Sequence, residues 1–162
     1  MGYAEAMKNV FLAISFAHVI DAGSGKVIPE FRQKVEAILH SLRTEAQVKV
    51  YCDLEDAKWR MSKGLPERGA VKDMRTLDEA DLLLCLVGEH PSVGAEFEMG
   101  YMVAKGKPVL LAMHVNGQLA SFNQGLVSAG LVTLITYDDA SSLAKQLAIA
   151  VNAPQEVITA TA

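Results

Sequence analysis

The chain has 162 residues, of which 51% are hydrophobic and 21% charged, and its formal net charge is -4. This composition predicts a single domain over residues 1–162 with a buried core and excludes a disordered chain. The charge argues against nucleic acid as a partner, and no apolar run has the length needed to cross a membrane.

Strands and helices alternate along the first half of the chain. The sequence predicts a strand at Val10–Phe16, a turn at Gly23–Lys26, a helix at Pro29–Arg43, a strand at Val48–Cys52, a loop with a brief helical turn at Asp53–Leu65, and a helix at Pro66–Glu79. The turn contains Gly-Ser-Gly-Lys, which matches a phosphate-binding loop only weakly and is better explained by a flexible turn.

The same alternation continues in the second half. It predicts a buried strand at Leu82–Val87, a helix at Gly94–Lys105, a strand at Pro108–Met113, a helix at Leu119–Ala129, a strand at Leu131–Thr136, a helix at Ala140–Val151, and a loose tail over 154–162. Five short strands separated by helices predict an α/β fold with a five-stranded parallel sheet and helices on both faces.

Parallel sheets of this kind bind ligands at the carboxyl ends of their strands, where the strand order reverses. The loops after Phe16, Cys52 and Val87 are therefore the first candidates for a functional site. Cys52 and Cys85 lack metal-ligand spacing, and we expect two buried free thiols in a reducing, cytoplasmic compartment. The four histidines are scattered, so the sequence predicts no metal site.

Two glutamates, Glu96 and Glu98, stand near the start of the helix predicted from Gly94. The helix dipole favours acids there, and this alone could explain both. However, Glu98 shares a face with Ala95 and Met102, which are small or apolar, so we expect Glu98 to face inward and Glu96 to face water. The helix N-terminus is expected to keep Glu98 ionised, and an acid on an apolar face beside a strand end is a candidate for function.

The span Asp73–Val109 contains an ordered set of motifs: Asp73, then Ala80-Asp81 before a hydrophobic strand, then Ser92 and Gly94, then Glu98-Met99-Gly100, then Gly106-Lys107-Pro108. This set resembles the signature of the nucleoside 2-deoxyribosyltransferase superfamily. The residues Phe11-Leu12, Phe16, Asp21 and Gly25 resemble the start of a branch that hydrolyses nucleoside 5'-monophosphates, including CMP hydrolases. The resemblance covers roughly residues 10 to 137 and implies a flavodoxin-like (Rossmann-like) fold.

The resemblance also implies roles for individual residues. Glu98 matches the nucleophile that forms a glycosyl-enzyme ester. Asp73 matches an acid that contacts the sugar or helps to protonate the leaving base, and Ser92 matches a residue near the substrate's 5' end. The other substrate-binding candidates are Ala13, Ile14, Ser15, His18, Trp59, Asp81, Gly94, Asn123 and Ser128.

Several of these candidates have structural alternatives. Trp59 either stacks on a base or packs in the core, and Asp81 either binds substrate or caps the preceding turn. Asn123 and Ser128 are candidates for the residue that a neighbouring subunit contributes in the family. The chain also departs from the branch, because Ala17 replaces an expected arginine and Ala95 an expected threonine. Phosphate recognition would then depend on His18, Lys26 or another cation.

The resemblance implies an enzyme that cleaves the N-glycosidic bond of a nucleoside 5'-monophosphate through Glu98 and releases the free base. The alternatives are a nucleoside 2-deoxyribosyltransferase that exchanges bases, and a non-catalytic nucleotide-binding or regulatory protein. Carboxylates suffice for the reaction, so we expect no cofactor. The expected partners are a small nucleoside or nucleotide and further copies of the chain, in a homodimer or larger homo-oligomer with shared sites.

Overall fold

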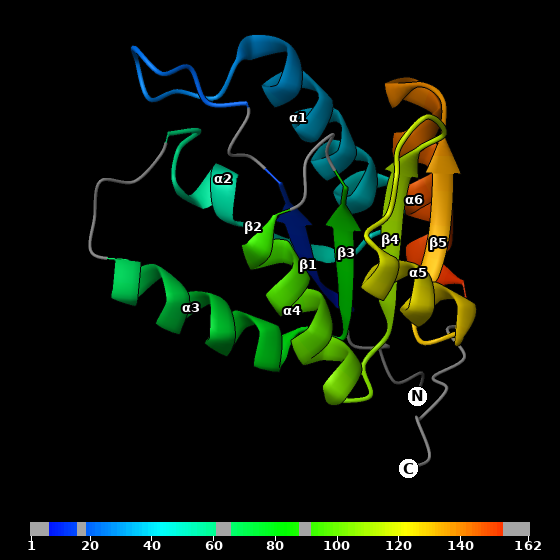
Figure 1. Ribbon diagram of the computed structural model, residues 1–162. Helices are drawn as coiled ribbons and strands as arrows, with labels where there is room; N and C mark the ends of the chain where they lie inside the picture. The colour runs from blue at the N-terminus through cyan, green and yellow to red at the C-terminus, as the bar shows by residue number, and fades with distance from the viewer. Residues whose placement is uncertain (1–6, 16–18, 61–65, 88–91, 154–162) are drawn as a thin grey trace, which may run out of the picture.

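The computed structural model describes residues 7–15, 19–60, 66–87 and 92–153, without the side chains of 66–68. Its centre is an all-parallel five-stranded sheet in the order β2-β1-β3-β4-β5 (Figure 1). The strands are β1 (Asn9–Ile14), β2 (Lys49–Cys52), β3 (Leu82–Leu86), β4 (Val109–His114) and β5 (Thr133–Tyr137).

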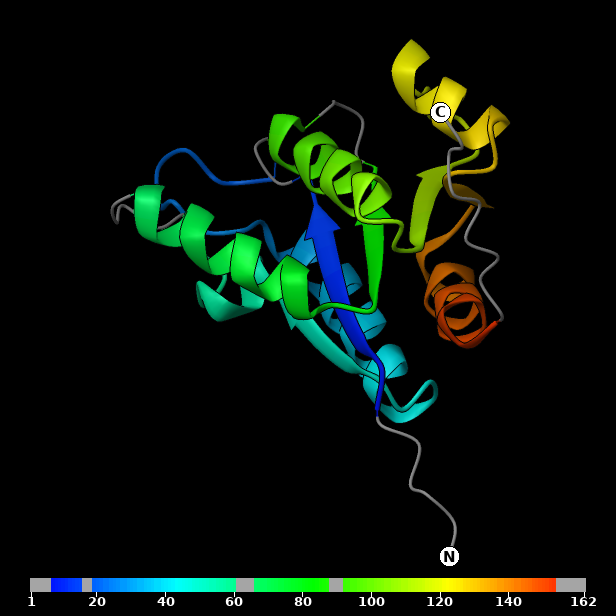
Figure 2. The same ribbon diagram turned by 90° about the horizontal axis from the view of Figure 1, so that it is seen from below.

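Helices cover both faces of the sheet. The helices are α1 (Pro29–Thr44), α2 (Asp53–Asp56), α3 (Pro66–Glu79), α4 (Val93–Ala104), α5 (Ser121–Ser128) and α6 (Ala140–Asn152). Figure 2 shows α1 and α6 on one face of the sheet and α3, α4 and α5 on the other. The flavodoxin-like α/β fold expected from the sequence is therefore confirmed.

The side chains of β1 alternate between these two layers, as the pleat of a strand requires. Val10 and Leu12 belong to the core shared with α1 and α6, whereas Phe11 and Ala13 belong to the core shared with α3 and α4. Because every residue of β3 is buried, this strand reads in the sequence as a continuous apolar run. The same alternation decides which residues at the ends of β1 and β2 face α4.

Most predicted elements agree with the structure to within two residues at each end. The predicted first strand continued to Phe16, but β1 ends at Ile14, and 16–18 lie outside the described residues, as does the predicted tail at 154–162. The helix predicted from Leu119 begins at Ser121, because Ala120 has an extended ψ of 149°. Within the described ranges, no helix combines the length and the apolar character needed to cross a membrane.

The Gly106-Lys107-Pro108 motif joins α4 to β4. Gly106 has a φ of +65°, a left-handed conformation that glycine adopts without strain at the end of a helix. The Lys107 Nζ donates hydrogen bonds to the carbonyl oxygens of Leu77 (3.3 Å), Asp78 (2.7 Å) and Ala80 (2.7 Å), where α3 ends. The motif therefore ends α4 and ties the end of α3 to the start of β4.

Candidate functional site

The strand order reverses between β1 and β3. From β1 the chain passes through α1 to β2 on one side, and it then returns through α3 to β3 on the other side. The carboxyl ends of β1 and β3 are thus the switch point at which this class of sheet binds ligands. Two pockets open there, and the first turn of α4 lies between them, since Ser92 and Ala95 line both.

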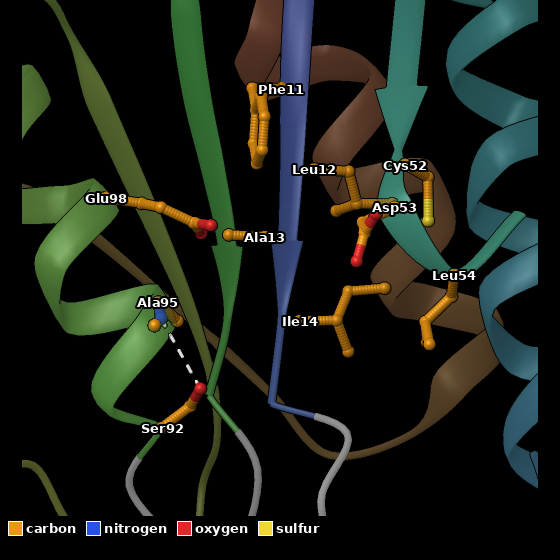
Figure 3. A pocket seen from close by; sticks show the side chains of 11 residues that line it. Phe11, Leu12, Ala13, Ile14, Cys52, Asp53, Leu54, Ser92, Ala95 and Glu98 are labelled. Atoms are coloured by element: carbon orange, nitrogen blue, oxygen red, sulfur yellow. Dashed lines mark hydrogen bonds between the residues drawn. The ribbon is translucent and has the colours of Figure 1, made fainter. Parts of the chain in front are cut away.

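The first of these, the Glu98 pocket, encloses about 370 Å³ including open solvent. Glu98 enters it from α4 and Asp53 from the start of α2, on either side of β1 (Figure 3). The wall is completed by Phe11, Leu12, Ala13, Ile14, Cys52, Leu54, Ser92, Gly94 and Ala95. The structure thereby brings the predicted Ala13, Ile14, Ser92, Gly94 and Glu98 together.

Glu98 projects from the inward face of α4, as its spacing from Ala95 and Met102 predicted. Ala95 and Met102 are buried, and Glu98 itself is partly buried. The pKa of Glu98 is raised to about 8, first by burial and then by the negative charges of Asp73 and Asp53. The expectation that the helix N-terminus keeps Glu98 ionised is wrong, because Glu98 lies in the second turn, where the dipole is weak and desolvation dominates.

Asp73 of α3 is hydrogen-bonded to Tyr51 of β2. The Tyr51 hydroxyl donates to Asp73 Oδ1 at 3.2 Å and lies 3.5 Å from Asp53 Oδ1. The Tyr51 ring packs on Phe11, with 5.1 Å between the centroids. Burial raises the pKa of Tyr51, and the nearby aspartates raise it further, so its proton remains in place at neutral pH. Tyr51 is therefore a fixed donor between two carboxylates.

Both aspartates are also harder to ionise than usual. Burial raises the pKa of Asp53 and of Asp73; Asp56 adds to the effect on Asp53, and Asp53 to that on Asp73. Lys72 acts in the opposite direction, and its ammonium lies 5.3 Å from the centroid of the Tyr51 ring. Three carboxyl groups with raised pKa values thus surround one end of the sheet. Among the described residues, no group of three His, Cys, Asp or Glu side chains is arranged to hold a metal ion.

The second pocket, the Asn123 pocket, lies on the β4 and α5 side of the first turn of α4. It encloses about 450 Å³ including open solvent, and its polar lining is Ser15, Ser92, Glu96, Gln118 and Asn123. Ser15 and Asn123, both predicted to bind substrate, are buried here. The prediction that Glu96 faces water is wrong, because its position in the first turn directs it to this pocket, where it is partly buried.

The remaining predicted residues lie elsewhere. Trp59 is buried in the core beside α1, with the Arg32 guanidinium 5.2 Å from the ring centroid. Asp81 directly precedes β3, at the amino end of the strands and opposite to the pockets. Its carboxylate accepts a 2.8 Å hydrogen bond from the Asn9 amide. Ser128 is exposed at the end of α5, and His18 lies outside the described residues. Trp59, Asp81 and Ser128 are not among the described residues that line either pocket.

The two cysteines are free and buried, as predicted. Cys52 lines the Glu98 pocket and Cys85 lines the Asn123 pocket. Burial raises the pKa of Cys52 to about 11 and that of Cys85 to about 12, so neither is a thiolate at neutral pH. Because thiols react as thiolates, neither cysteine is in the form that acts as a nucleophile.

Asp53 and Tyr51 were missed as candidates in the sequence. The segment after Cys52 was selected as a candidate loop, yet its acids were not separated from those of a solvent-exposed turn. The alternation of side chains along a strand could have identified them. Tyr51 and Asp53 are two residues apart at the end of β2, so they lie on the same face of the sheet.

The fold and the pockets define an α/β protein with an acidic small-molecule site at the switch point of its sheet. The sequence model described as nucleoside 2-deoxyribosyltransferase matches residues 25–152. The chain therefore belongs to the nucleoside 2-deoxyribosyltransferase family.

Comparison with curated proteins adds one relative. It is "Putative 2'-deoxynucleoside 5'-phosphate N-hydrolase 1" of Thermofilum pendens (strain DSM 2475 / Hrk 5), which is 34% identical over 77 residues. The match covers 47% of this chain and 53% of the relative, so the chain spans about half the length of that protein.

Solved structures share the fold at low sequence identity. The Clostridium botulinum CMP N-glycosidase BcmB superposes with a TM-score of 0.66 at 21% identity, covering 88% of this chain and 99% of BcmB. The solution structure of BlsM superposes with a TM-score of 0.73 at 20% identity, covering 96% of this chain and 98% of BlsM. These similarities establish the fold.

Proposed function

We propose that this protein cleaves the N-glycosidic bond of a nucleoside 5'-monophosphate with Glu98 as the nucleophile, and that water accepts the sugar. The observation that carries the proposal is the partly buried Glu98 carboxyl at the switch-point pocket, with raised-pKa acids beside it. The names of the Thermofilum relative and of BcmB support a nucleotide as the substrate.

In the proposed reaction the Glu98 carboxylate attacks C1' of the sugar and the bond from C1' to the base breaks. Two easier displacements through an ester replace one difficult displacement, which is the advantage of covalent catalysis. The leaving base needs a proton, and Asp73 and Asp53 are the carboxyl groups beside Glu98 whose raised pKa values suit them to carry one.

The 5' end of the substrate is assigned to Ser92 and the first turn of α4. Ser92 lines both pockets and accepts a 3.3 Å hydrogen bond from the Ala95 amide, which leaves its hydroxyl proton available to a phosphate. The amides of Val93 and Gly94 belong to the first turn, whose donors have no partner inside a helix. No Lys, Arg or His is among the described residues that line either pocket, so the helix terminus carries more of this task.

The second candidate is base exchange by a nucleoside 2-deoxyribosyltransferase. The description of the matching family favours it, and the two reactions share the glycosyl-enzyme ester as their intermediate. They differ in whether water or a second base attacks that ester.

The test is incubation of the protein with ribo- and deoxyribonucleosides and their 5'-monophosphates, with free base measured by chromatography. Base release from the monophosphates alone supports the proposed hydrolase. Turnover that requires a second base supports the transferase. Binding without turnover contradicts both and indicates a non-catalytic nucleotide-binding or regulatory protein.

Replacement of Glu98 by Ala is expected to abolish base release while circular dichroism stays unchanged. Intact-mass measurement of wild type mixed with substrate is expected to find a sugar-phosphate adduct that Glu98→Ala lacks. The control is Glu45→Ala at an exposed position that lines neither pocket, and this variant retains the adduct. Full activity of Glu98→Ala would exclude this residue as the nucleophile.

A further inference from the structure

Asn123 is a buried amide side chain at the wall of a pocket. It lies in the first turn of α5, is 7% exposed, and lines the Asn123 pocket. Its carboxamide oxygen and nitrogen keep access to the pocket and make no hydrogen bond with any of the described residues. An amide that is so far removed from water gains free energy when a ligand offers it both a donor and an acceptor.

The rest of the Asn123 pocket decides what kind of group could make these bonds. Among the described lining residues there is one charged side chain, Glu96, and no Lys, Arg or His. Much of the wall is apolar, including Val87, Met99 and Leu119. This lining suits an uncharged group with an apolar face and a polar edge, and the carboxylate disfavours a doubly charged phosphate.

The two pockets share a wall, which is the first turn of α4. Ser92 and Ala95 line both of them. When the sugar lies beside Glu98 and its 5'-phosphate lies at Ser92, a group attached to the far side of that phosphate reaches the Asn123 pocket. Esterification also reduces the charge of the phosphate from about -2 to -1, which weakens its repulsion by Glu96.

We propose that this protein also cleaves nucleotides whose 5'-phosphate is esterified to a second nucleoside, and that the Asn123 pocket holds this second nucleoside. The inference rests on the proposed function. Adenine presents an N–H donor beside a ring-nitrogen acceptor, and the Asn123 amide offers the complementary acceptor and donor. The apolar wall is then available to the faces of the ring.

The bonds that change are those of the proposed function. The bond from C1' to the base breaks and one water is consumed, of which the hydroxyl goes to C1' and the proton to the base. The phosphodiester stays intact. The products are the free base and a dinucleotide that lacks this base.

The experiment compares three substrates that carry the same nucleoside. They are the best 5'-monophosphate found for wild type, the methyl ester of its phosphate, and the dinucleoside monophosphate in which the phosphate is joined to the 3'-oxygen of adenosine, or of cytidine where the released base is itself adenine. Wild type is expected to cleave all three. KM for the dinucleoside is expected to be about 10-fold below KM for the methyl ester, the size of one bidentate pair between an amide and a base.

Chromatography and mass spectrometry identify the products. The base of the 5'-phosphorylated nucleoside is expected to be released while the second nucleoside keeps its base. A product that retains the phosphodiester shows that the dinucleoside was not first split into a monophosphate.

Variants of Asn123 test whether its amide binds the second nucleoside. Asn123→Ala is expected to raise KM for the dinucleoside by about 10-fold more than KM for the methyl ester. Asn123→Asp has nearly the same shape and is expected to give the same contrast, because a carboxylate cannot donate to a ring nitrogen. The matched control is Asn116→Ala, which removes an exposed carboxamide outside both pockets. Circular dichroism checks that each variant folds.

Several results would overturn the inference. If wild type cleaves the monophosphate and neither ester, only this inference fails. Equal KM values for the two esters, or equal effects of the Asn123 variants on both, would remove the second nucleoside from the Asn123 pocket. Release of the base of the second nucleoside would contradict the orientation. If wild type cleaves none of the three substrates, the proposed function fails and this inference fails with it.

Discussion

Glu98, the proposed nucleophile, is expected to lower the stability of the folded chain at high pH. Its pKa rises from 4.5 to about 8 in the folded chain, so between these pH values the folded chain binds a proton that the unfolded chain has released. Stability therefore falls as the pH rises through this window. Glu98→Gln removes the effect, and we expect it to raise the free energy of unfolding at pH 8.5 by on the order of 3 kcal/mol.

Urea unfolding at pH 5 and at pH 8.5 measures this difference. Wild type and Glu98→Gln are expected to have similar stability at pH 5 and to diverge at pH 8.5. Glu96→Gln, on the same helix, serves as the control. A Glu98→Gln variant that is less stable than wild type at pH 8.5 would contradict the desolvation argument.

Glu96 is expected to affect the choice between nucleosides and monophosphates. It lines the Asn123 pocket next to Ser92, which is assigned to the 5' end of the substrate. A carboxylate there repels a phosphate, so Glu96→Gln is expected to lower KM for a monophosphate by roughly 5-fold, about 1 kcal/mol, and to leave KM for the nucleoside unchanged. Steady-state kinetics on a matched pair of substrates measure this, with the exposed Glu45→Gln as control. An equal change in both KM values would exclude a charge effect.

The sequence predicted the orientation of a side chain correctly where that orientation depends on the spacing of residues within one helix. The inward orientation of Glu98 followed from its spacing to Ala95 and Met102. Its raised pKa could not be predicted, because it depends first on burial in the folded chain and then on Asp73 and Asp53, which are 25 and more residues away in the sequence and arrive from α3 and α2. The direction of Glu96 was wrong for a related reason, since the Asn123 pocket is completed by residues from the distant segment at α5.

At the scale of elements, Lys107 holds α3 to the sheet. Its ammonium satisfies three carbonyl oxygens where α3 ends, and substitution by Met leaves these acceptors without their charged donor. We expect Lys107→Met to lower the free energy of unfolding by about 2 kcal/mol, the usual cost of losing a hydrogen bond to a charged group.

Thermal unfolding measures the loss, and Lys105→Met is a matched control. Lys105 pairs with Asp78 at 3.2 Å, but both side chains are about half exposed, and exposed ion pairs contribute little. Equal changes in Tm for the two variants would show that the three carbonyl contacts do not stabilise α3.

Element types and most boundaries followed from the sequence because they depend on local signals. Pro29 and Pro66 begin α1 and α3, and Gly106 ends α4 with a positive φ. The start of α5 was placed too early, since Leu119 is apolar but precedes the helix and lines the Asn123 pocket. In the sequence, an apolar residue that lines a pocket cannot be distinguished from an apolar residue on the buried face of a helix.

At the scale of the whole molecule, we expect exposed apolar side chains on α4 and α5 to form the contact between subunits of the expected homo-oligomer. Val93 and Phe97 are 84% and 60% exposed and share one face of α4, and Phe122 on α5 is 72% exposed. We expect Phe97→Glu to shift the protein toward monomer, because a charge in an apolar contact must be desolvated.

Sedimentation velocity measures the oligomeric state of wild type and variant. The control is Ile149→Glu on α6, which is 73% exposed on the opposite layer of the fold. If sites are shared between subunits, Phe97→Glu also loses base release, and the loss is reversed at high protein concentration. A wild type that sediments as a monomer would contradict the expectation of an oligomer.

The hydrogen bonds of Lys107 also show which property of the protein the Gly106-Lys107-Pro108 motif reports. Gly106, Lys107 and Pro108 are recognisable in the sequence, yet in the structure they end a helix, hold another and begin a strand, without lining either pocket. Such a motif carries information about architecture. Two chains could share it and differ in the sugar or base they accept, because we expect substrate choice to depend on residues of the pocket walls such as Asp53 and Glu96.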